Sequence, residues 1–433
     1  MTEPNPSIAN VSPVWSHLLD KVIVRGEGAY LWDQEGRRYL DFTCGIGVTN
    51  TGHCHPRVVE AIREQAGRIL HLQANIAHHE PMLRLIAALK QVVPPELDSY
   101  FFSNSGAEAV EAAIKLARHA TRRANVIAFQ RGFHGRTIAT MSLTSSKTIY
   151  RAGYQPMMAG VFFAPYAYCY RCPKAEANPD YTPNGCCDWP LEQVRFLLKS
   201  QTAPDETAAI LVEPVQGEGG YIVPPANFLR GLREICNEHG IMLILDEIQS
   251  GFGRTGRLFA FEHVGVTPDI LVIAKGLASG MPLSGIVARR EIMERWPVGA
   301  HGGTYGGNAV ACAAAEATIA TLLEEGLVEN AARMGKELLT RLQALQSRYP
   351  GVGDVRGLGL MVGVEFVVPG SRTPDKDRTK AVQRACKEAG LLLLTCGTDD
   401  NVIRWMPPLI IGERELEAGL RIFEAALESV VNS

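Results

Sequence analysis

The feature that most constrains the fold is a series of short apolar runs that end abruptly in small or charged residues. Many of them are separated by stretches with helical periodicity, such as residues 228–239. Continuous apolar runs of strand length are typical of strands covered on both faces, and their alternation with helices indicates a mostly parallel sheet. The runs lie at residues 99–103, 126–129, 208–212, 241–245, 270–274 and 283–288.

The pattern changes beyond residue 309, and the 433 residues are too many for one simple core. Elements expected there are helices at 309–324, 328–348, 379–389 and 413–431, a Gly-rich strand at 355–366 and a strand at 391–394. We therefore predict an α/β protein with a large domain at residues 56–320 and a smaller α/β domain at residues 321–433. Residues 1–55 are expected to pack with the smaller domain.

Composition and charge exclude several classes of partner. The formal net charge of -3 provides no basic field for nucleic acid or acidic lipid. No apolar stretch approaches the roughly 20 residues that cross a membrane. Residues 1–10 lack the basic and then apolar order of a secretory signal. We expect a cytoplasmic protein that binds neither nucleic acid nor membrane.

Polar residues follow the apolar runs, at the sheet edge where parallel α/β proteins bind ligands. Lys275 directly follows such a run, although burying an ammonium group is costly. A buried lysine with a lowered pKa is suited to Schiff-base chemistry, whereas a lysine reaching solvent at the sheet edge is the alternative. Asp246 ends another run, and a protonated pyridine nitrogen would supply the cation that a buried carboxylate needs. A structural ion pair or a helix cap is the alternative for Asp246.

Two Gly-containing turns are candidates for binding phosphate. Ser105, Gly106 and Ala107 lie between a predicted strand and helix, where free backbone N–H groups attract anions. A plain helix N-cap is the alternative. The run at 302–308 opens another predicted helix. Phe133, which follows a third run, could stack on a planar ring or belong to the core.

Together these motifs resemble the signature of the class III (omega) aminotransferases, which use pyridoxal 5'-phosphate (PLP). The resemblance extends from about Trp32 to Pro408 and, within the family, is greatest to the 4-aminobutyrate aminotransferases. It implies a PLP fold-type I homodimer with shared active sites, and a tetramer of two such dimers is the alternative. The motifs are residues 104–109, 133–137, 213–220, 245–256, 274–276 and 303–308.

The resemblance also implies roles for individual residues. Lys275 forms the Schiff base and moves the proton, and Asp246 pairs with the pyridine nitrogen. Gln249 contacts the phenolic oxygen, and Phe133 stacks on the ring. The remaining cofactor-binding candidates are Ser105, Gly106 and Ala107 on the phosphate, Thr304 supplied from the other subunit, and His134, Glu213 and Ile248.

Substrate binding is expected to depend on two arginines. Arg404 would hold the α-carboxylate of 2-oxoglutarate or glutamate through a bidentate fork. Glu218 would pair with Arg404 when the donor lacks an α-carboxylate, and Arg136 would bind the distal carboxylate. Ile46 is a further substrate-binding candidate. Surface ion pairs are the alternative for these charged residues.

The function implied is transfer of an amino group from an ω-amino acid, with 4-aminobutyrate favoured, to 2-oxoglutarate, giving a semialdehyde and glutamate. Ornithine, acetylornithine, lysine or β-alanine are alternative donors. A racemase or epimerase on the same scaffold is another alternative, and so is a non-catalytic binding protein. Lys275 together with Asp246 argues against the last, and Glu218 together with Arg404 favours transfer.

The sequence departs from the family pattern in a Cys-rich stretch between residues 168 and 189. Its cysteines are Cys169, Cys172, Cys186 and Cys187. A C-x-x-C pair followed by two more cysteines could ligate zinc. Adjacent cysteines rarely both reach one tetrahedral site, so we expect reduced thiols in a surface loop and assign no metal.

Overall fold

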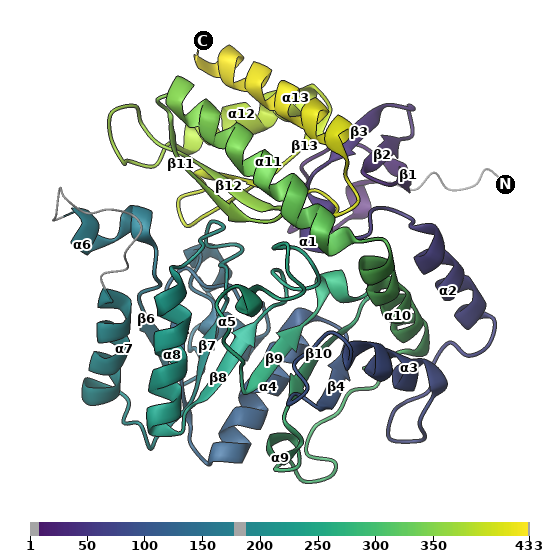
Figure 1. The fold of residues 1–433 in the computed structure, drawn as a ribbon, viewed down its shortest axis with the longest axis vertical. Coiled ribbons are helices and arrows are strands. Elements are labelled where there is room, and N and C mark those ends of the chain that lie inside the picture. Colours follow the sequence, from purple (N-terminus) through teal and green to yellow (C-terminus); the bar gives the residue numbers. More distant parts are fainter. Residues whose placement is uncertain (1–7, 177–187, 432–433) are drawn as a thin grey trace.

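The computed structural model describes residues 8–176 and 188–431, and its centre is a seven-stranded sheet (Figure 1). The strand order is β4-β10-β9-β8-β7-β5-β6. β10 runs antiparallel to both neighbours, whereas β9, β8, β7, β5 and β6 are parallel. The strands are β4 (Ser99–Ser103), β5 (Asn125–Phe129), β6 (Val161–Ala164), β7 (Thr207–Val212), β8 (Met242–Asp246), β9 (Ile270–Ile273) and β10 (Ser284–Ala288).

Both faces of this large sheet are covered, which explains why its strands are apolar without alternation. Ile127 and Phe129 of β5 pack into one core with the helices α7 (Trp189–Ser200) and α8 (Ala226–His239). Val126 and Ala128 pack into a second core with α4 (Gly106–Thr121) on the opposite face. Successive residues of β5 are thus buried alternately in the two cores, so that residues 126–129 are all apolar. The predicted α/β fold with a mostly parallel sheet is confirmed.

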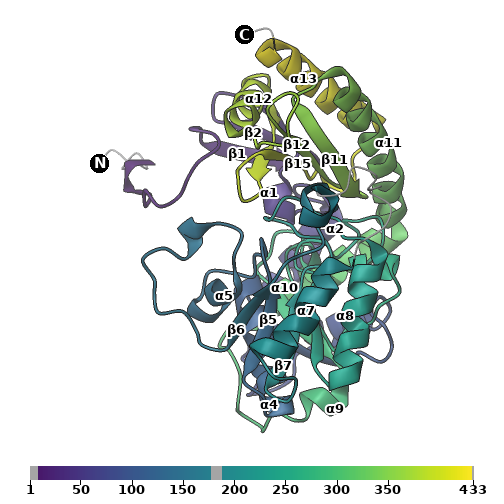
Figure 2. The ribbon, with the colours of Figure 1, turned by 90° about the vertical axis from the view of Figure 1, so that its left-hand side faces the viewer.

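A second sheet, the C-terminal sheet, has the order β11-β12-β15-β14. Its strands are β11 (Val352–Leu358), β12 (Met361–Phe366), β14 (Leu394–Cys396) and β15 (Val402–Trp405). The helices α11 (Leu327–Arg348), α12 (Lys376–Glu388) and α13 (Glu413–Val431) lie beside it. Figure 2 shows this sheet and its helices stacked above the large sheet, with α1 (Cys44–Gly47) between them.

A third sheet joins the two ends of the chain. β1 (Ile23–Glu27), β2 (Tyr30–Asp33) and β3 (Arg38–Asp41) form an antiparallel meander. β3 then pairs in parallel with β13 (Leu391–Leu392). The N-terminal segment is therefore hydrogen-bonded to the C-terminal part of the chain. The domain boundaries at residues 55 and 320 stay a prediction, and α10 (Ala309–Glu324) continues across the second one.

Two predicted strands are wrong in detail. Residues 355–366 were expected to form one strand, but β11 and β12 form a hairpin that turns at Gly359, where φ is +53°. A glycine permits this left-handed backbone. Residues 391–394 were also expected to form one strand. Instead, β13 and β14 belong to different sheets, because the chain changes sheets at Leu393.

Of the remaining α-helices, α2 (Pro56–Ala66) and α3 (Glu80–Leu89) pack against α10, and α5 (Ile138–Leu143) and α9 (Arg290–Met293) pack against α4. The short α6 (Pro173–Glu176) adjoins the turn at Cys169–Arg171. Among residues 8–176 and 188–431, every helix is too short or too polar to cross a lipid bilayer. The same part of the chain contains no group of three or more His, Cys, Asp or Glu side chains able to hold a metal. Cys186 and Cys187 lie outside the described residues, so the suggested cysteine site stays open.

Candidate active site

The site lies where successive strands of the large sheet end. Asp246 is the last residue of β8, Lys275 comes just after β9, and Glu213 directly follows β7. Because these strands are parallel neighbours, the residues at their carboxyl ends are brought to one edge. The charges of Asp246, Arg404 and Glu213 all act on Lys275, which shows that the C-terminal sheet also contributes to this edge.

Asp246 is held by a buried histidine. One carboxylate oxygen of Asp246 lies 2.7 Å from Nδ1 of His134, and the other accepts a hydrogen bond from the backbone N–H of Ile248 at 3.1 Å. Asp246 is 4% exposed and His134 is 2% exposed. Burial disfavours the imidazolium, but the hydrogen bond and charge of Asp246 outweigh it and raise the pKa of His134. The Asp246 carboxylate is thus fixed in position by contacts to both of its oxygens.

Lys275 has both an unusual backbone and an unusual charge balance. Its φ of +47° lies in the left-handed region, which a residue with a side chain adopts at a cost and which is concentrated at functional sites. Burial lowers the pKa of Lys275 to about 8, against the opposing attraction of Asp246. A lysine with this pKa has an appreciable neutral fraction near neutral pH, which a nucleophilic amine requires.

Glu213 connects two turns at the edge of the site. Its carboxylate accepts hydrogen bonds from the backbone N–H groups of Phe133 at 3.1 Å and Gly217 at 3.0 Å. Burial raises the pKa of Glu213 to about 7. The side chain therefore fixes the turn that carries Phe133 and His134 relative to the loop that leads to Glu218.

The predicted phosphate cradle is the start of α4. Ser105 is its N-cap and forms a capping box with Glu108, so that the plain capping role is also present. The first backbone N–H groups of a helix have no partner within the helix and remain suited to an anion. A Cβ atom at Gly106 would lie 2.9 Å from Cδ1 of Ile248, so a larger residue here would displace the Ile248 side chain.

Glu218 and Arg404 meet in the structure. Arg404 on β15 donates from Nη1 to Oε2 of Glu218 at 3.0 Å, and Arg404 is 6% exposed. Burial opposes the charge of Arg404, but Glu218 outweighs it and raises the pKa of the guanidinium. Two residues that the sequence prediction missed also face Glu218. The Tyr150 hydroxyl donates to Oε1 of Glu218 at 3.0 Å, and Nζ of Lys147 lies 3.4 Å from the same oxygen.

Arg136 lies among aromatic rings beside this cluster. Its guanidinium carbon is 5.9 Å from the centroid of the Phe133 ring and 4.9 Å from that of Tyr150. The two rings are 5.3 Å apart at an interplanar angle of 76°. Arg136 itself is exposed in the single chain and available to a carboxylate. The neighbourhood of Tyr150 was hidden in the sequence because the residue follows no strand end.

Other candidates have fewer contacts. Within residues 8–176 and 188–431, Thr304 makes no hydrogen bond to another site residue and lies in the exposed segment 302–305. Ile46 is 47% exposed, with φ at +67°. Gln249 closely approaches Gly217, and its buried Oε1 has no hydrogen-bond partner in the described chain. The predicted roles of these three residues stay predictions.

These residues fit a bound PLP molecule. Lys275 provides an amine with a lowered pKa, Asp246 provides a buried carboxylate, and the start of α4 provides anion-binding N–H groups. Oε1 of Gln249 is buried without a hydrogen-bond partner in the described chain, so a polar group of a bound ligand would satisfy it. This combination at the edge of a mostly parallel seven-stranded sheet defines the fold-type I class of PLP enzymes.

Comparison with known proteins agrees with this class. The model of the aminotransferase class-III family matches residues 11–427. The chain therefore belongs to the class III aminotransferases and is a PLP-dependent transaminase, as predicted. It is 41% identical to a probable 4-aminobutyrate aminotransferase of Bacillus subtilis, over 94% of this chain and 92% of the relative.

Two further comparisons concern the donor and the fold. The chain is 43% identical to an acetylornithine aminotransferase of Methanopyrus kandleri, over 94% of both chains. A PLP-bound amine transaminase from an uncultivated Pseudomonas species has a similar structure, with a TM-score of 0.90 and 31% identity. That likeness covers 98% of this chain and 100% of the other. Relatives of nearly equal identity thus have names that differ in the donor.

Proposed function

We propose that this transaminase moves the amino group of an ω-amino acid, with 4-aminobutyrate favoured, to 2-oxoglutarate. The observation that carries the proposal is the 3.0 Å pair between Glu218 and the buried Arg404. An ω-amino acid such as 4-aminobutyrate has one carboxylate, whereas 2-oxoglutarate has two. A site that serves both substrates must bind the second carboxylate of 2-oxoglutarate in one half-reaction. In the half-reaction of the ω-amino acid, it must neutralise the arginine that this carboxylate would occupy.

The charged residues divide this work. Arg136 binds the carboxylate that both substrates share, and the neighbouring rings of Phe133 and Tyr150 help to position its guanidinium. Glu218 neutralises Arg404 while the ω-amino acid is bound. When 2-oxoglutarate or glutamate binds, Glu218 releases Arg404, which then holds the α-carboxylate through its fork.

Lys275 and Asp246 carry the chemistry that follows. PLP supplies an aldehyde that accepts the amino group and a ring that disperses negative charge from the deprotonated carbon. Nζ of Lys275 removes the proton from the amine-bearing carbon of the substrate and later returns a proton. Asp246, held in place by its hydrogen bond to His134, would pair with the pyridine nitrogen of bound PLP. The N-terminus of α4, with Ser105, Gly106 and Ala107, would hold the phosphate of PLP together with Thr304 of the partner subunit.

An absorbance titration of the purified holoenzyme with 4-aminobutyrate, without any acceptor, tests this function. We expect the yellow colour of the Lys275-bound cofactor to disappear stoichiometrically and to return when 2-oxoglutarate is added. An enzyme that stays yellow would show that the donor is wrong, and the α,ω-diamino acids would be tried next. Racemisation of an α-amino acid without loss of colour would contradict transamination itself.

A further inference from the structure

The loop that carries Glu218 places its carboxylate between two cations. Oε2 of Glu218 accepts from Arg404, while Oε1 accepts from Tyr150 and lies 3.4 Å from Nζ of Lys147. The Glu218 side chain is 13% exposed and that of Lys147 is 16% exposed. A carboxylate that left Arg404 here would remain largely buried, and a buried unpaired charge is costly. If Glu218 is to release Arg404, the Glu218 carboxylate therefore needs another positively charged or hydrogen-bonding partner close by.

Lys147 has the charge to be that partner. Burial disfavours its ammonium form, but the hydrogen bond to Asp400 and the charge of Glu218 outweigh burial and raise the pKa of Lys147. Nζ forms an ion pair with Asp400 that fixes the side chain in place. The same Asp400 accepts from Lys376 at 2.9 Å on its more exposed side. Lys147 is thus a positioned cation with one carboxylate on each side.

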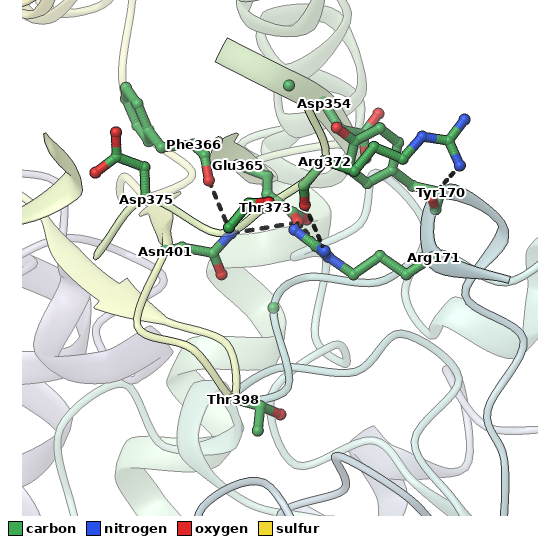
Figure 3. A network of polar contacts seen from close by, with 12 residues as sticks. Tyr170, Arg171, Asp354, Glu365, Phe366, Arg372, Thr373, Asp375, Thr398 and Asn401 are labelled. Atoms are coloured by element: carbon green, nitrogen blue, oxygen red, sulfur yellow. Dashed lines mark hydrogen bonds and ion pairs between the residues drawn. The ribbon is translucent and has the colours of Figure 1, made fainter. Parts of the chain in front are cut away.

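The segment 397–401, which carries Asp400, is itself fastened to the C-terminal sheet. Figure 3 shows Asn401 donating from Nδ2 to Oε1 of Glu365 at 3.3 Å and to the carbonyl of Phe366 at 2.9 Å. The fully buried Glu365 also accepts from Nε of Arg171 at 2.6 Å. At the other end of the segment, the N–H of Gly397 donates to the carbonyl of Glu218 at 2.9 Å. A backbone hydrogen bond therefore joins Glu218 to the segment 397–401, whose Asp400 forms the ion pair with Lys147.

We propose that Lys147, aided by Tyr150, receives the Glu218 carboxylate when it leaves Arg404, and so determines how well the site accepts substrates with an α-carboxylate. The inference rests on the proposed exchange of Glu218 at Arg404. The carboxylate already touches Tyr150 through Oε1, so a side-chain rotation exchanges one cation for the other without moving the loop. Lys147 is then a specificity-determining residue rather than a catalytic one, because it contacts Glu218 and not the reacting atoms.

Binding of two unreactive five-carbon acids to the holoenzyme tests this inference. Glutarate carries two carboxylates and requires a free Arg404, whereas valerate carries one and does not. We expect Lys147→Met to raise the dissociation constant of glutarate about tenfold, as for the loss of a partly buried ion pair, and that of valerate less than about twofold. Isothermal titration calorimetry measures both constants without turnover.

Two further variants separate charge from folding. Lys147→Arg keeps a cation beside Glu218, so we expect it to bind glutarate nearly as the unaltered enzyme does. Lys376→Met is the matched control, because Lys376 shares Asp400 with Lys147 but does not contact Glu218. Its binding of both acids should be unchanged. Equal weakening of both acids in Lys147→Met would reveal a merely structural role and overturn the proposal, as would unchanged binding of glutarate.

Failure of this inference is distinguishable from failure of the proposed function. If 4-aminobutyrate leaves the unaltered enzyme yellow while Lys147→Met loses glutarate selectively, the donor is wrong and the role of Lys147 holds. If 4-aminobutyrate removes the colour and Lys147→Met keeps its affinity for glutarate, the donor is right and the role of Lys147 is wrong.

Discussion

At the scale of residues, the site depends on neighbours that the sequence does not reveal. Asp246 was predicted from its place after an apolar run, but its buried partner His134 follows β5, which is separated from β8 by β7. The order of strands in a sheet is not encoded in local patterning, so this pairing could not be predicted. Lys147 and Tyr150 were missed because they lie in a segment without a strand end. Lys275 and Glu218, by contrast, lie in motifs that were recognised, and Arg404 was assigned from the family resemblance.

Replacement of Lys275 tests the centre of the site. We expect Lys275→Ala to abolish turnover while it still binds PLP non-covalently, because the remaining phosphate and ring contacts are left in place. Steady-state assays and the absorbance spectrum of the dialysed protein measure the two effects. Lys90→Ala, which removes an exposed lysine, should retain both activity and colour. Unchanged turnover in Lys275→Ala would contradict the assignment.

The lowered pKa of Lys275 predicts a pH dependence for the attachment of PLP to the cofactor-free enzyme. Only the neutral amine attacks an aldehyde, so the rate should rise with pH and level off above about 8, the pKa of Lys275. An ordinary lysine, with a pKa of 10.5, would continue to gain rate well above that pH. Stopped-flow absorbance over pH 6.5 to 10 would distinguish the two curves.

At the scale of elements, the strands of the large sheet and the long helices were predictable, but the turns were not. The helix at 309–324 and the final helix at 413–431 have the predicted bounds. The hairpin of β11 and β12 was read as one strand because its apolar and Gly residues continue across the turn. Its turn is determined by packing, since a Cβ atom at Gly359 would lie 2.3 Å from the backbone carbon of Thr255.

This hairpin predicts an unequal response to two glycine substitutions. Gly359→Ala combines an unfavourable φ of +53° with a clash against backbone, so it should lower the free energy of unfolding by roughly 2–4 kcal/mol. Gly370→Ala has a φ of +77° but nothing within 4 Å of the added atom. It should cost about 1 kcal/mol. Urea unfolding of the two variants compares them, and equal losses would show that the clash is relieved.

At the scale of the whole molecule, two predicted parts of the site, Thr304 in the segment 302–305 and Ile46, are exposed in a single chain. We therefore expect that one chain does not form the complete site. The family resemblance predicts a dimer in which Thr304 of the partner subunit reaches the phosphate. No local pattern in one sequence describes such a surface, since it depends on a second copy.

Light scattering coupled to size-exclusion chromatography tests this assembly. We expect a mass of two chains or a multiple of it, and we expect Thr304→Ala to raise the dissociation constant of PLP by roughly tenfold through loss of one phosphate hydrogen bond. Thr340→Ala, on the exposed surface of α11, is the control and should leave PLP binding unchanged. A stable and active monomer would contradict the shared site.

The parallel pairing of β3 with β13 has a consequence for the birth of the protein on the ribosome. Leu40 is synthesised about 350 residues before its partner Leu391, a wait of roughly 20–70 s at bacterial and eukaryotic rates of translation. Throughout that time β3 exposes an edge with unpaired backbone groups, a surface that invites pairing with other chains. A chaperone that binds nascent chains would therefore find its first client segment at the N-terminal meander, and this segment would remain available until after β10, the last strand of the large sheet, has been made.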